Sequence, residues 1–344
     1  MVIFGIDAHK RTHTVVAVSD AGRELACRTV ATTTAAHLDL LGWAQGLAEE
    51  RMWAVEDCRH VSRRLERDLL GAGERIVRVP PKLMAAARSS ARTYGKSDPI
   101  DALAVARAAL REPDLPMARL DGPERELRLL VDHRDDLVAE RARIMARLRW
   151  HLHELDPAWA PAPRSLDRAK TWAEIDARLE GVDGLVARLA RELVQRCRHL
   201  SADINALTVE ITALITPLTP TLLAVVGCGP LTAAKIVAET AGVDRFRSAN
   251  AYARHTGTAP LPVWSANHTR HRLSRTGNRQ LNAALHRIAI TQARWHPGAR
   301  TLLARRRANG DNSREAFRIL KRRLNDVVYR ALHADHATTI PLAA

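Results

Sequence analysis

The chain opens with short apolar or alternating runs that are separated by tight polar turns. This pattern predicts strands, and we place the first three at residues 2–7, 14–19 and 24–31. Helical periodicity then alternates with two more apolar runs, which predicts helices at 34–50 and 60–70 and strands at 52–56 and 75–79. In the first helix we expect Leu38, Leu41 and Leu47 to face inward.

The predicted order of these elements, βββαβαβα, defines a fold class. Three strands joined by tight turns form an antiparallel meander, whereas alternating strands and helices place parallel strands side by side. The result is a mixed sheet flanked by helices. This is the order of an α/β ribonuclease-H-like domain, which we expect over residues 1–115.

Longer helices follow over residues 120–216. Apolar positions form one stripe through residues 124–156, and they recur almost strictly at steps of four and three from Ile175 to Leu214. Such a seam is typical of a coiled coil, so we expect an antiparallel helical hairpin, within one chain or between chains. A plain pair of packed helices in a monomer is the alternative, but the length of the seam favours self-association.

A third, mostly helical domain is expected over residues 217–338. Gly227 and Gly229 stand between an apolar helix end and a small-residue helix, which is the helix-hairpin-helix pattern. Its glycines let backbone N–H groups approach a phosphate, although plain helix-turn-helix packing gives the same pattern. A loop-rich stretch, 246–265, and a basic loop, 267–275, then precede two helices, at 279–294 and 313–333.

Four acidic residues stand where this fold would bring them together. Asp7 ends the first strand and Glu56 ends the fourth, which should lie beside it. Asp98 and Asp101 are three residues apart at the start of an Ala-rich helix, so they share one face. A cluster of carboxylate oxygens is the ligand set of a divalent metal, and two-metal phosphoryl transfer depends on one.

Each acid also has a plainer interpretation. Asp98 before Pro99 is a good N-cap, and an acid three residues later complements the helix dipole. Asp7 suits an ordinary turn at a strand end. Asp57 competes with Glu56, because only one of two adjacent strand residues faces the site.

Charge and composition indicate which kinds of molecule the protein binds. Lys and Arg total 53 against 38 Asp and Glu, a net charge of +15, which points to a polyanion such as nucleic acid. Richness in both Arg and Ala can partly reflect a GC-rich genome. There is no apolar run long enough for a transmembrane helix and no signal peptide is predicted. The scattered cysteines suggest reduced thiols in the cytoplasm.

Together these motifs resemble the DEDD transposases of insertion-sequence family one-hundred-and-ten over nearly the whole chain. The motifs that carry the resemblance are Gly5-Ile6-Asp7-Ala8-His9-Lys10, Val55-Glu56, Gly95-Lys96-Ser97-Asp98-Pro99-Ile100-Asp101-Ala102, Val226-Gly227-Cys228-Gly229-Pro230-Leu231-Thr232-Ala233, Gly257-Thr258-Ala259-Pro260, Ser265 and Ser274-Arg275-Thr276-Gly277-Asn278.

The resemblance implies a RuvC-like nuclease domain whose tetrad is Asp7, Glu56, Asp98 and Asp101, with Mg²⁺ or Mn²⁺. It also implies a C-terminal transposase domain in which the Ser265 hydroxyl attacks DNA and forms a phosphoserine link. A structured RNA from the element, a bridge RNA, would join donor and target DNA, and the enzyme would work as a dimer or tetramer. This would be a bacterial cytoplasmic protein at the nucleoid, with no membrane partner.

The basic and glycine residues near these motifs are expected to contact double-stranded DNA or the guide RNA; they are Lys10, Lys96, Gly227, Gly229, Arg270, Arg272 and Arg275. Two positions depart from the family pattern. Ala266 follows Ser265 where the family has Gly, and Glu56-Asp57-Cys58-Arg59 replaces Glu-x-x-Gly.

Other functions also fit the residues. From the residues alone a loop serine is a weak candidate nucleophile, and Ser274 is an alternative to Ser265. A metal-dependent, junction-resolvase-like endonuclease or a ribonuclease would use the same acids with water as its nucleophile. A non-catalytic, basic coiled-coil protein would bind nucleic acid while the acids merely cap and pair.

Overall fold

The computed structural model describes residues 1–56, 59–80, 83, 97–112, 115, 117–119, 122–265, 268–272 and 277–339, with the backbone alone for residues 59, 262–265, 268–272 and 339. The chain divides into two compact units, Met1–Gly122 and Pro123–Ala344. Each has its own hydrophobic core. None of the helices in the described ranges combines the length and the hydropathy that crossing a bilayer requires.

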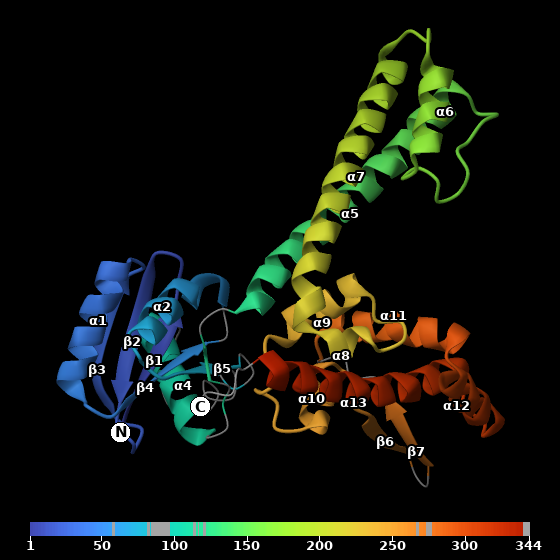
Figure 1. The fold of residues 1–344 in the computed structure, drawn as a ribbon. Helices are drawn as coiled ribbons and strands as arrows, with labels where there is room; N and C mark the ends of the chain where they lie inside the picture. The colour runs from blue at the N-terminus through green and yellow to red at the C-terminus, as the bar shows by residue number, and fades with distance from the viewer. Residues whose placement is uncertain are drawn as a thin grey trace. The chain divides into compact units, whose positions relative to one another are not determined.

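The first unit is a five-stranded mixed sheet in the order β3-β2-β1-β4-β5 (Figure 1). Its strands are β1 (Val2–Ala8), β2 (Thr12–Val18), β3 (Glu24–Ala31), β4 (Arg51–Glu56) and β5 (Ile76–Val79). β1, β2 and β3 pair antiparallel, whereas β4 runs parallel to both β1 and β5. The predicted meander, the mixed sheet and the ribonuclease-H-like strand order are confirmed.

Side chains of β1 alternate between two helical layers. Phe4 and Ile6 face one core, together with side chains from α1 (Thr34–Leu47) and α2 (Arg59–Gly71). Ile3 faces the other, beneath α4 (Asp98–Arg111). The predicted inward face of α1 is confirmed for Leu41, which is buried, and is wrong for Leu38 and Leu47, which are 53% and 42% exposed. The buried positions of α1 are His37, Leu40, Leu41 and Ala44.

Gly5 lets α4 lie directly on β1. A Cβ added at Gly5 would stand 2.2 Å from the carbonyl oxygen of Ala102 and 2.5 Å from the backbone nitrogen of Ala106. Only glycine fits so close to the helix backbone, and the alanines of α4 keep that helix thin on the same side. This contact anchors the segment that carries Asp98 and Asp101 against the strand that carries Asp7.

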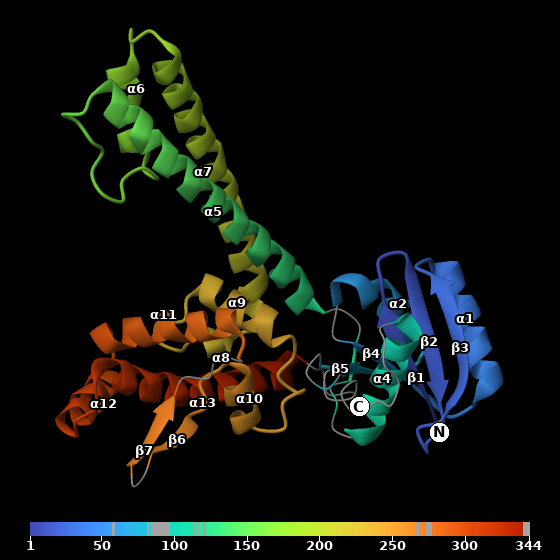
Figure 2. The same cartoon turned by 180° about the vertical axis from the view of Figure 1, so that it is seen from behind.

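The second unit contains a long antiparallel helix pair, α5 (Pro123–Leu155) and α7 (Leu185–Leu218), seen from two sides in Figures 1 and 2. Arg134 donates to the Thr208 hydroxyl at 2.8 Å. Seven residues later Arg141 donates to Ser201, seven residues earlier, at 2.7 Å. The residue number of the donor rises along α5 while that of its partner falls along α7, so the two helices run antiparallel within one chain.

The apolar seam that begins at Ile175 does not form one helix. Ile175 belongs to the separate helix α6 (Ala169–Leu179), and α7 starts only at Leu185. Between them Gly181 and Gly184 have φ of 71° and 109°, which an α-helix cannot accommodate. The periodicity continues across the break because both helices pack on the same core.

The remaining helices of the second unit surround one core; they are α8 (Pro220–Leu223), α9 (Pro230–Thr240), α10 (Ala249–His255), α11 (Arg279–Trp295), α12 (Pro297–Ala308) and α13 (Ser313–Thr339). The predicted helices at 279–294 and 313–333 correspond to α11 and α13. The stretch predicted to be loops holds α10 and one strand of a two-stranded antiparallel ribbon, β6 (Leu261–Ser265) and β7 (His268–Arg272).

We predict that Gly5→Ala lowers the free energy of unfolding by about 1–3 kcal/mol, because the added methyl group overpacks the contact between β1 and α4. Gly42→Ala is the matched control, since an added Cβ there meets nothing within 4 Å. In the middle of α1 it should stabilise by up to about 1 kcal/mol. Urea midpoints measured by circular dichroism compare the two variants, and equal midpoints would contradict the packing argument.

A second prediction concerns His13, which is fully buried against His37 on the α1 side of the sheet. Burial, with added repulsion from His37 and His9, lowers the pKa of His13 from 6.5 to about 4. Below pH 6.5 the unfolded chain therefore gains a proton that the folded chain does not. Stability should fall as the pH drops from 6.5 towards 4, by up to about 3 kcal/mol for this group.

The free energy of unfolding measured between pH 7 and pH 4 tests this expectation. His13→Leu should flatten the acid limb of the profile, whereas His60→Leu, at an exposed position, should leave it unchanged. Parallel profiles for wild type and His13→Leu would show that His13 is not the titrating group.

Candidate active site

Three aspartates meet where α4 begins beside the end of β1. Asp7 lies two residues beyond Gly5, so both face α4. Asp98 and Asp101 lie in the first turn of α4. Asp7 and Asp101 are each 7% exposed, and the side chain of Asp98 is 54% exposed. The site therefore has a buried floor and an open side.

Asp98 is not the N-cap that the sequence suggested. The helix starts one residue earlier than expected, with Ser97 at the N-cap position and Asp98 as the first helical residue. The Asp98 carboxylate instead lies 3.5 Å from the imidazole of His9. Capping therefore does not account for this acid.

His9 is a site residue to which the sequence analysis assigned no role. Its Nε2 lies 3.0 Å from Oδ2 of Asp7 and 3.5 Å from Oδ1 of Asp98. One possible ligand atom from each of the three residues lies within 4.8 Å of the other two. The signal was present in the Asp-x-His spacing, because residues two apart at a strand end lie on the same side.

Register places Glu56 on the strand beside Asp7. Val55 of β4 pairs with Ile6 of β1, so Glu56 is level with the end of β1. Ala54 packs in the core under α4 while Val55 packs in the opposite core. By alternation Glu56 shares the α4 side with Asp7. The alternative residue, Asp57, lies outside the described residues. Among the described residues, the group whose ligand atoms lie close enough to share an ion consists of Asp7, His9 and Asp98, without Glu56 or Asp101.

The local electrostatics favour a cation. Burial raises the pKa of Asp7, the nearby charges of Asp101 and Asp98 raise it further, and His9 opposes the shift. Clustered carboxylates of this kind repel one another and are paired or coordinated when buried. The donor set, carboxylate oxygens and one imidazole, fits a divalent metal.

Ser265 ends strand β6, where its backbone pairs with His268 of β7. Arg270 and Arg272 lie along β7. Lys96, Ala266, Ser274 and Arg275 lie outside the described residues, and Lys10 is exposed in the turn after β1. The serine predicted in a loop is thus at the outer end of a ribbon, eight residues beyond Gly257.

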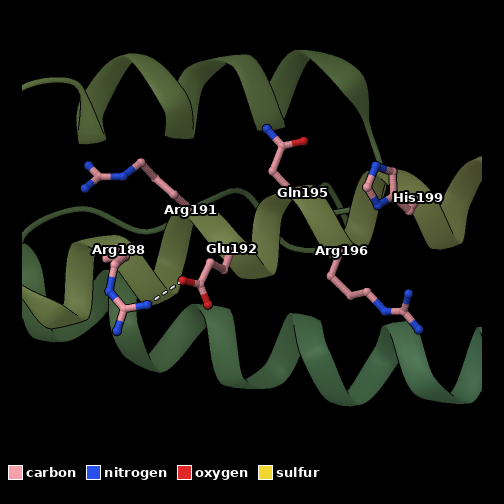
Figure 3. Close-up of a pocket in the computed structure, with 6 residues that line it drawn as sticks. All are labelled: Arg188, Arg191, Glu192, Gln195, Arg196 and His199. Atoms are coloured by element: carbon pink, nitrogen blue, oxygen red, sulfur yellow. Dashed lines mark hydrogen bonds and ion pairs between the residues drawn. The ribbon is translucent and has the colours of Figure 1, made fainter.

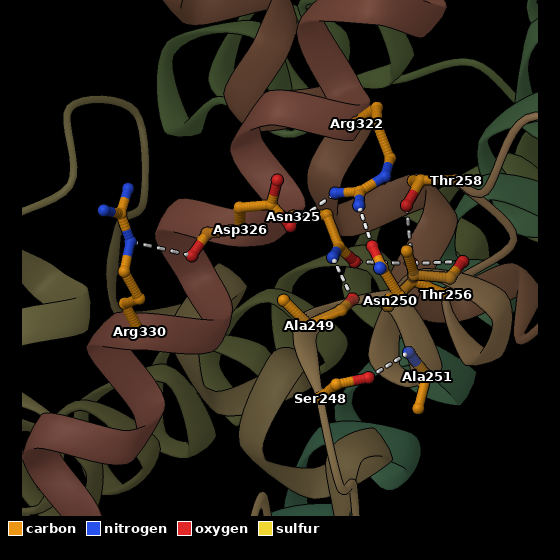
Figure 4. Close-up of polar contacts among 11 residues, drawn as sticks. Ser248, Ala249, Asn250, Ala251, Thr256, Thr258, Arg322, Asn325, Asp326 and Arg330 are labelled. Carbon is orange, nitrogen blue, oxygen red and sulfur yellow. Dashed lines mark hydrogen bonds and ion pairs between the residues drawn. The ribbon is translucent and has the colours of Figure 1, made fainter.

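Buried polar contacts fix the base of this ribbon. A Cβ at Gly277 would stand 2.2 Å from the nitrogen of Gly257, so the two ends of the ribbon cross in direct contact. Thr256 donates its hydroxyl to Oδ1 of Asn325 on α13 at 2.7 Å, as Figure 4 shows. Asn282 of α11 donates to the carbonyl oxygen of Thr256 at 2.9 Å. Helices α11 and α13 therefore hold the ribbon at its root.

The helix-hairpin-helix glycines occupy different environments. Gly227 has φ of 88° and lies against α11, where an added Cβ would be 2.9 Å from Cβ of Thr291. Turn geometry and packing therefore explain Gly227 without a phosphate. Gly229, at the N-cap position of α9, is open, with nothing within 4 Å of an added Cβ.

A basic groove of about 430 Å³ runs along α7 (Figure 3). Arg188 pairs with Glu192, and Arg196 donates to Glu140 of α5 at 2.7 Å. Arg191 donates to the carbonyl oxygens of Leu179 and Val182. Arg191 and Arg196 therefore tie α7 to α6 and α5, whereas the pair of Arg188 and Glu192 lies within α7.

A ribonuclease-H-like sheet with an acidic cluster at the end of its first strand defines a metal-dependent, nuclease-type domain. Comparison with known sequences identifies the family: residues 4–157 match the DEDD transposase model of the IS110 family. Residues 220–304 match the family described as "Transposase IS116/IS110/IS902 family". The chain belongs to this family, and it is a transposase, an enzyme that acts on DNA.

Full-length relatives are proteins of insertion elements. The 42 kDa protein of IS900 from Mycobacterium paratuberculosis is 29% identical, over 98% of this chain and 96% of the relative. The 44.8 kDa protein of IS116 from Streptomyces clavuligerus is 29% identical, over 95% and 94%. Among solved structures, T. thermophilus RuvC in complex with a Holliday junction shares 15% identity at a TM-score of 0.28, covering 34% of this chain and 99% of RuvC.

We predict that Asp7→Asn stabilises the metal-free protein at neutral pH. A carboxyl group whose pKa is raised on folding contributes stability below its unfolded pKa of 3.8, and that stability is lost as the pH rises through the folded pKa. Removing the charge removes this penalty. Thermal unfolding in EDTA should show a higher midpoint for Asp7→Asn than for wild type.

With divalent ions present, the wild type should instead have the higher midpoint of thermal unfolding. Mn²⁺ should raise the midpoint of the wild type by mass action and leave Asp7→Asn almost unchanged. Asp39→Asn, at an exposed position on α1, is the control and should behave as wild type in both conditions. A lower midpoint for Asp7→Asn in EDTA would mean that Asp7 is held by favourable partners.

Proposed function

We propose that this transposase cuts and rejoins DNA at the ends of an insertion sequence through attack of the Ser265 hydroxyl, assisted by divalent metal at Asp7, Glu56, Asp98 and Asp101. The observation that carries the proposal is the convergence of buried Asp7 with Asp98 and Asp101 at one end of the sheet. Carboxylates gathered around a buried floor repel one another, and a bound cation would relieve that repulsion.

In the proposed reaction Ser265 Oγ attacks a backbone phosphorus, and the bond from phosphorus to one deoxyribose oxygen breaks. The serine proton is lost, the leaving oxygen takes up a proton, and the strand end stays bound as a phosphoserine ester. The carboxylates of Asp7, Glu56, Asp98 and Asp101 would hold Mg²⁺, which would supply positive charge to offset that of the phosphate in the transition state. The hydroxyl of a second strand then attacks the phosphorus of the ester and loses its proton, the bond from phosphorus to Ser265 Oγ breaks, and the serine oxygen takes up a proton as the DNA is resealed.

Each of three consecutive segments of the chain has its own role in the proposed function. Residues 1–115 would be the nuclease domain, 120–216 the helical arm and 217–338 the domain that supplies the serine. We propose that the enzyme assembles as a homo-oligomer through the arm, since Leu129 and Val209 are 56% and 70% exposed on its two helices. A structured guide RNA is proposed as a partner from the family resemblance and the net charge of +15.

The remaining proposed contacts to nucleic acid come from both units. Lys10 and Lys96 flank the acidic site in sequence, whereas Arg270, Arg272 and Arg275 follow Ser265. Gly229 opens the N-terminus of α9 to a phosphate. Gly227, which packs against α11, would support this turn without touching the phosphate.

The decisive experiment incubates the full chain with end-labelled duplex DNA spanning the end of its own insertion sequence, with Mg²⁺ and element RNA. We expect a covalent protein–DNA adduct on denaturing gels from wild type. Ser265→Ala should give no adduct, because it removes the attacking oxygen. Asp98→Asn combined with Asp101→Asn should also give none, through loss of the metal.

Ser274→Ala is the matched control, because that serine stands nearby in the chain and should retain the adduct. An adduct that survives in Ser265→Ala but vanishes in Ser274→Ala would move the nucleophile to Ser274. Cleavage by wild type without any adduct, leaving a free 5′-phosphate, would favour water as the nucleophile and a resolvase-like endonuclease.

A further inference from the structure

His9 is built into the acidic site by the backbone. It follows β1 in the turn to β2, where its backbone N–H donates to the carbonyl oxygen of Thr12 at 3.0 Å. This contact closes the turn and fixes the Cα of His9 relative to Asp7. The side chain is 51% exposed, whereas the side chain of Asp7 is only 10% exposed. His9 therefore stands on the open side of a site with a buried floor.

The spacing of the donor atoms matches a coordination shell. Two ligands at adjacent corners of an octahedron, each about 2.1 Å from the ion, are about 3.0 Å apart. His9 Nε2 lies 3.0 Å from the Asp7 oxygen and 3.5 Å from the Asp98 oxygen. One possible ligand atom from each of Asp7, His9 and Asp98 lies within 4.8 Å of the other two, and His9 and Asp98 are half exposed, so the open side is accessible to water or phosphate oxygens.

We propose that His9 is a ligand of the divalent ion, through Nε2, and that this nitrogen makes the site prefer Mn²⁺ to Mg²⁺. The proposal rests on the metal centre of the proposed function. Mg²⁺ binds almost entirely through oxygen and keeps its waters, whereas transition metals accept imidazole readily. A centre of carboxylates with one imidazole thus suits Mn²⁺ better than a centre of carboxylates alone.

A competing role for His9 is a hydrogen-bond donor that neutralises Asp7 and Asp98 only while no ion is present. In that case Nε2 moves away when the ion enters, and the ion contacts oxygen alone. The two roles predict different couplings between a bound Mn²⁺ ion and nitrogen, because only direct ligation brings an imidazole nitrogen within bonding distance. Activity is not needed to separate them.

The test uses pulsed electron paramagnetic resonance on the untagged, full-length chain loaded with one equivalent of Mn²⁺. We expect a directly coordinated nitrogen in the wild-type spectrum, and a changed coupling when the histidines carry the heavier nitrogen isotope. His9→Gln should lose the coupling and bind Mn²⁺ roughly tenfold more weakly, a loss of the size seen for altered metal sites. Mg²⁺ affinity, measured by calorimetry, should change much less.

His60→Gln is the control, because His60 is exposed on α2 of the same unit; it should keep both coupling and affinity. Bound Mn²⁺ without nitrogen coupling in isotope-labelled wild type, or coupling that persists in His9→Gln, would overturn the assignment while leaving the acidic metal centre intact. Mn²⁺ affinity unchanged by Asp7→Asn would instead remove that centre, and the proposed function with it.

Discussion

The close contact between β1 and α4 at Gly5 is the constraint on which the acidic site depends. Strand and helix are separated by 89 residues in the sequence, yet their backbones meet with no side chain between them. Because the helix begins beside the end of the strand, Asp98 and Asp101 arrive at Asp7 as a consequence of packing. A small residue at one position thus determines where the charges of three others lie.

That arrangement works against stability. Burial and like charge raise the pKa of Asp7, so the folded chain holds an unfavourable group that a neutral isostere would relieve. Unfavourable electrostatics of this kind persist where binding uses them. The opposite face of the same sheet carries a second unfavourable polar group, His13, whose two ring nitrogens are buried without a hydrogen-bond partner among the described residues. The two faces therefore respond to acid in different ways.

Much of the fold follows from pattern in the sequence, because the strands are short, alternating and separated by turn residues. The convergence of Asp7, Asp98 and Asp101 was likewise predictable from strand ends and helical spacing. The inward face of α1 was predictable only in part: Leu41 is buried as expected, but the face also includes His37, which is held by Asp68 at 2.8 Å, a contact between distant segments. The contact of His9 with Asp7 was foreseeable from the Asp-x-His spacing, whereas its contact with Asp98 joins distant segments and follows only from the fold.

The strand that ends at Ser265 belongs to a ribbon that is anchored at its base, where Gly257 and Gly277 are in contact and Thr256 bonds to Asn325. Its two strands pair with each other, so adding or deleting one pair of residues on each strand preserves the register and the facing of every side chain. Each such step moves the tip by about 7 Å. A change in hairpin length alone can therefore alter how far residue 265 lies from the helices beneath, without altering those helices.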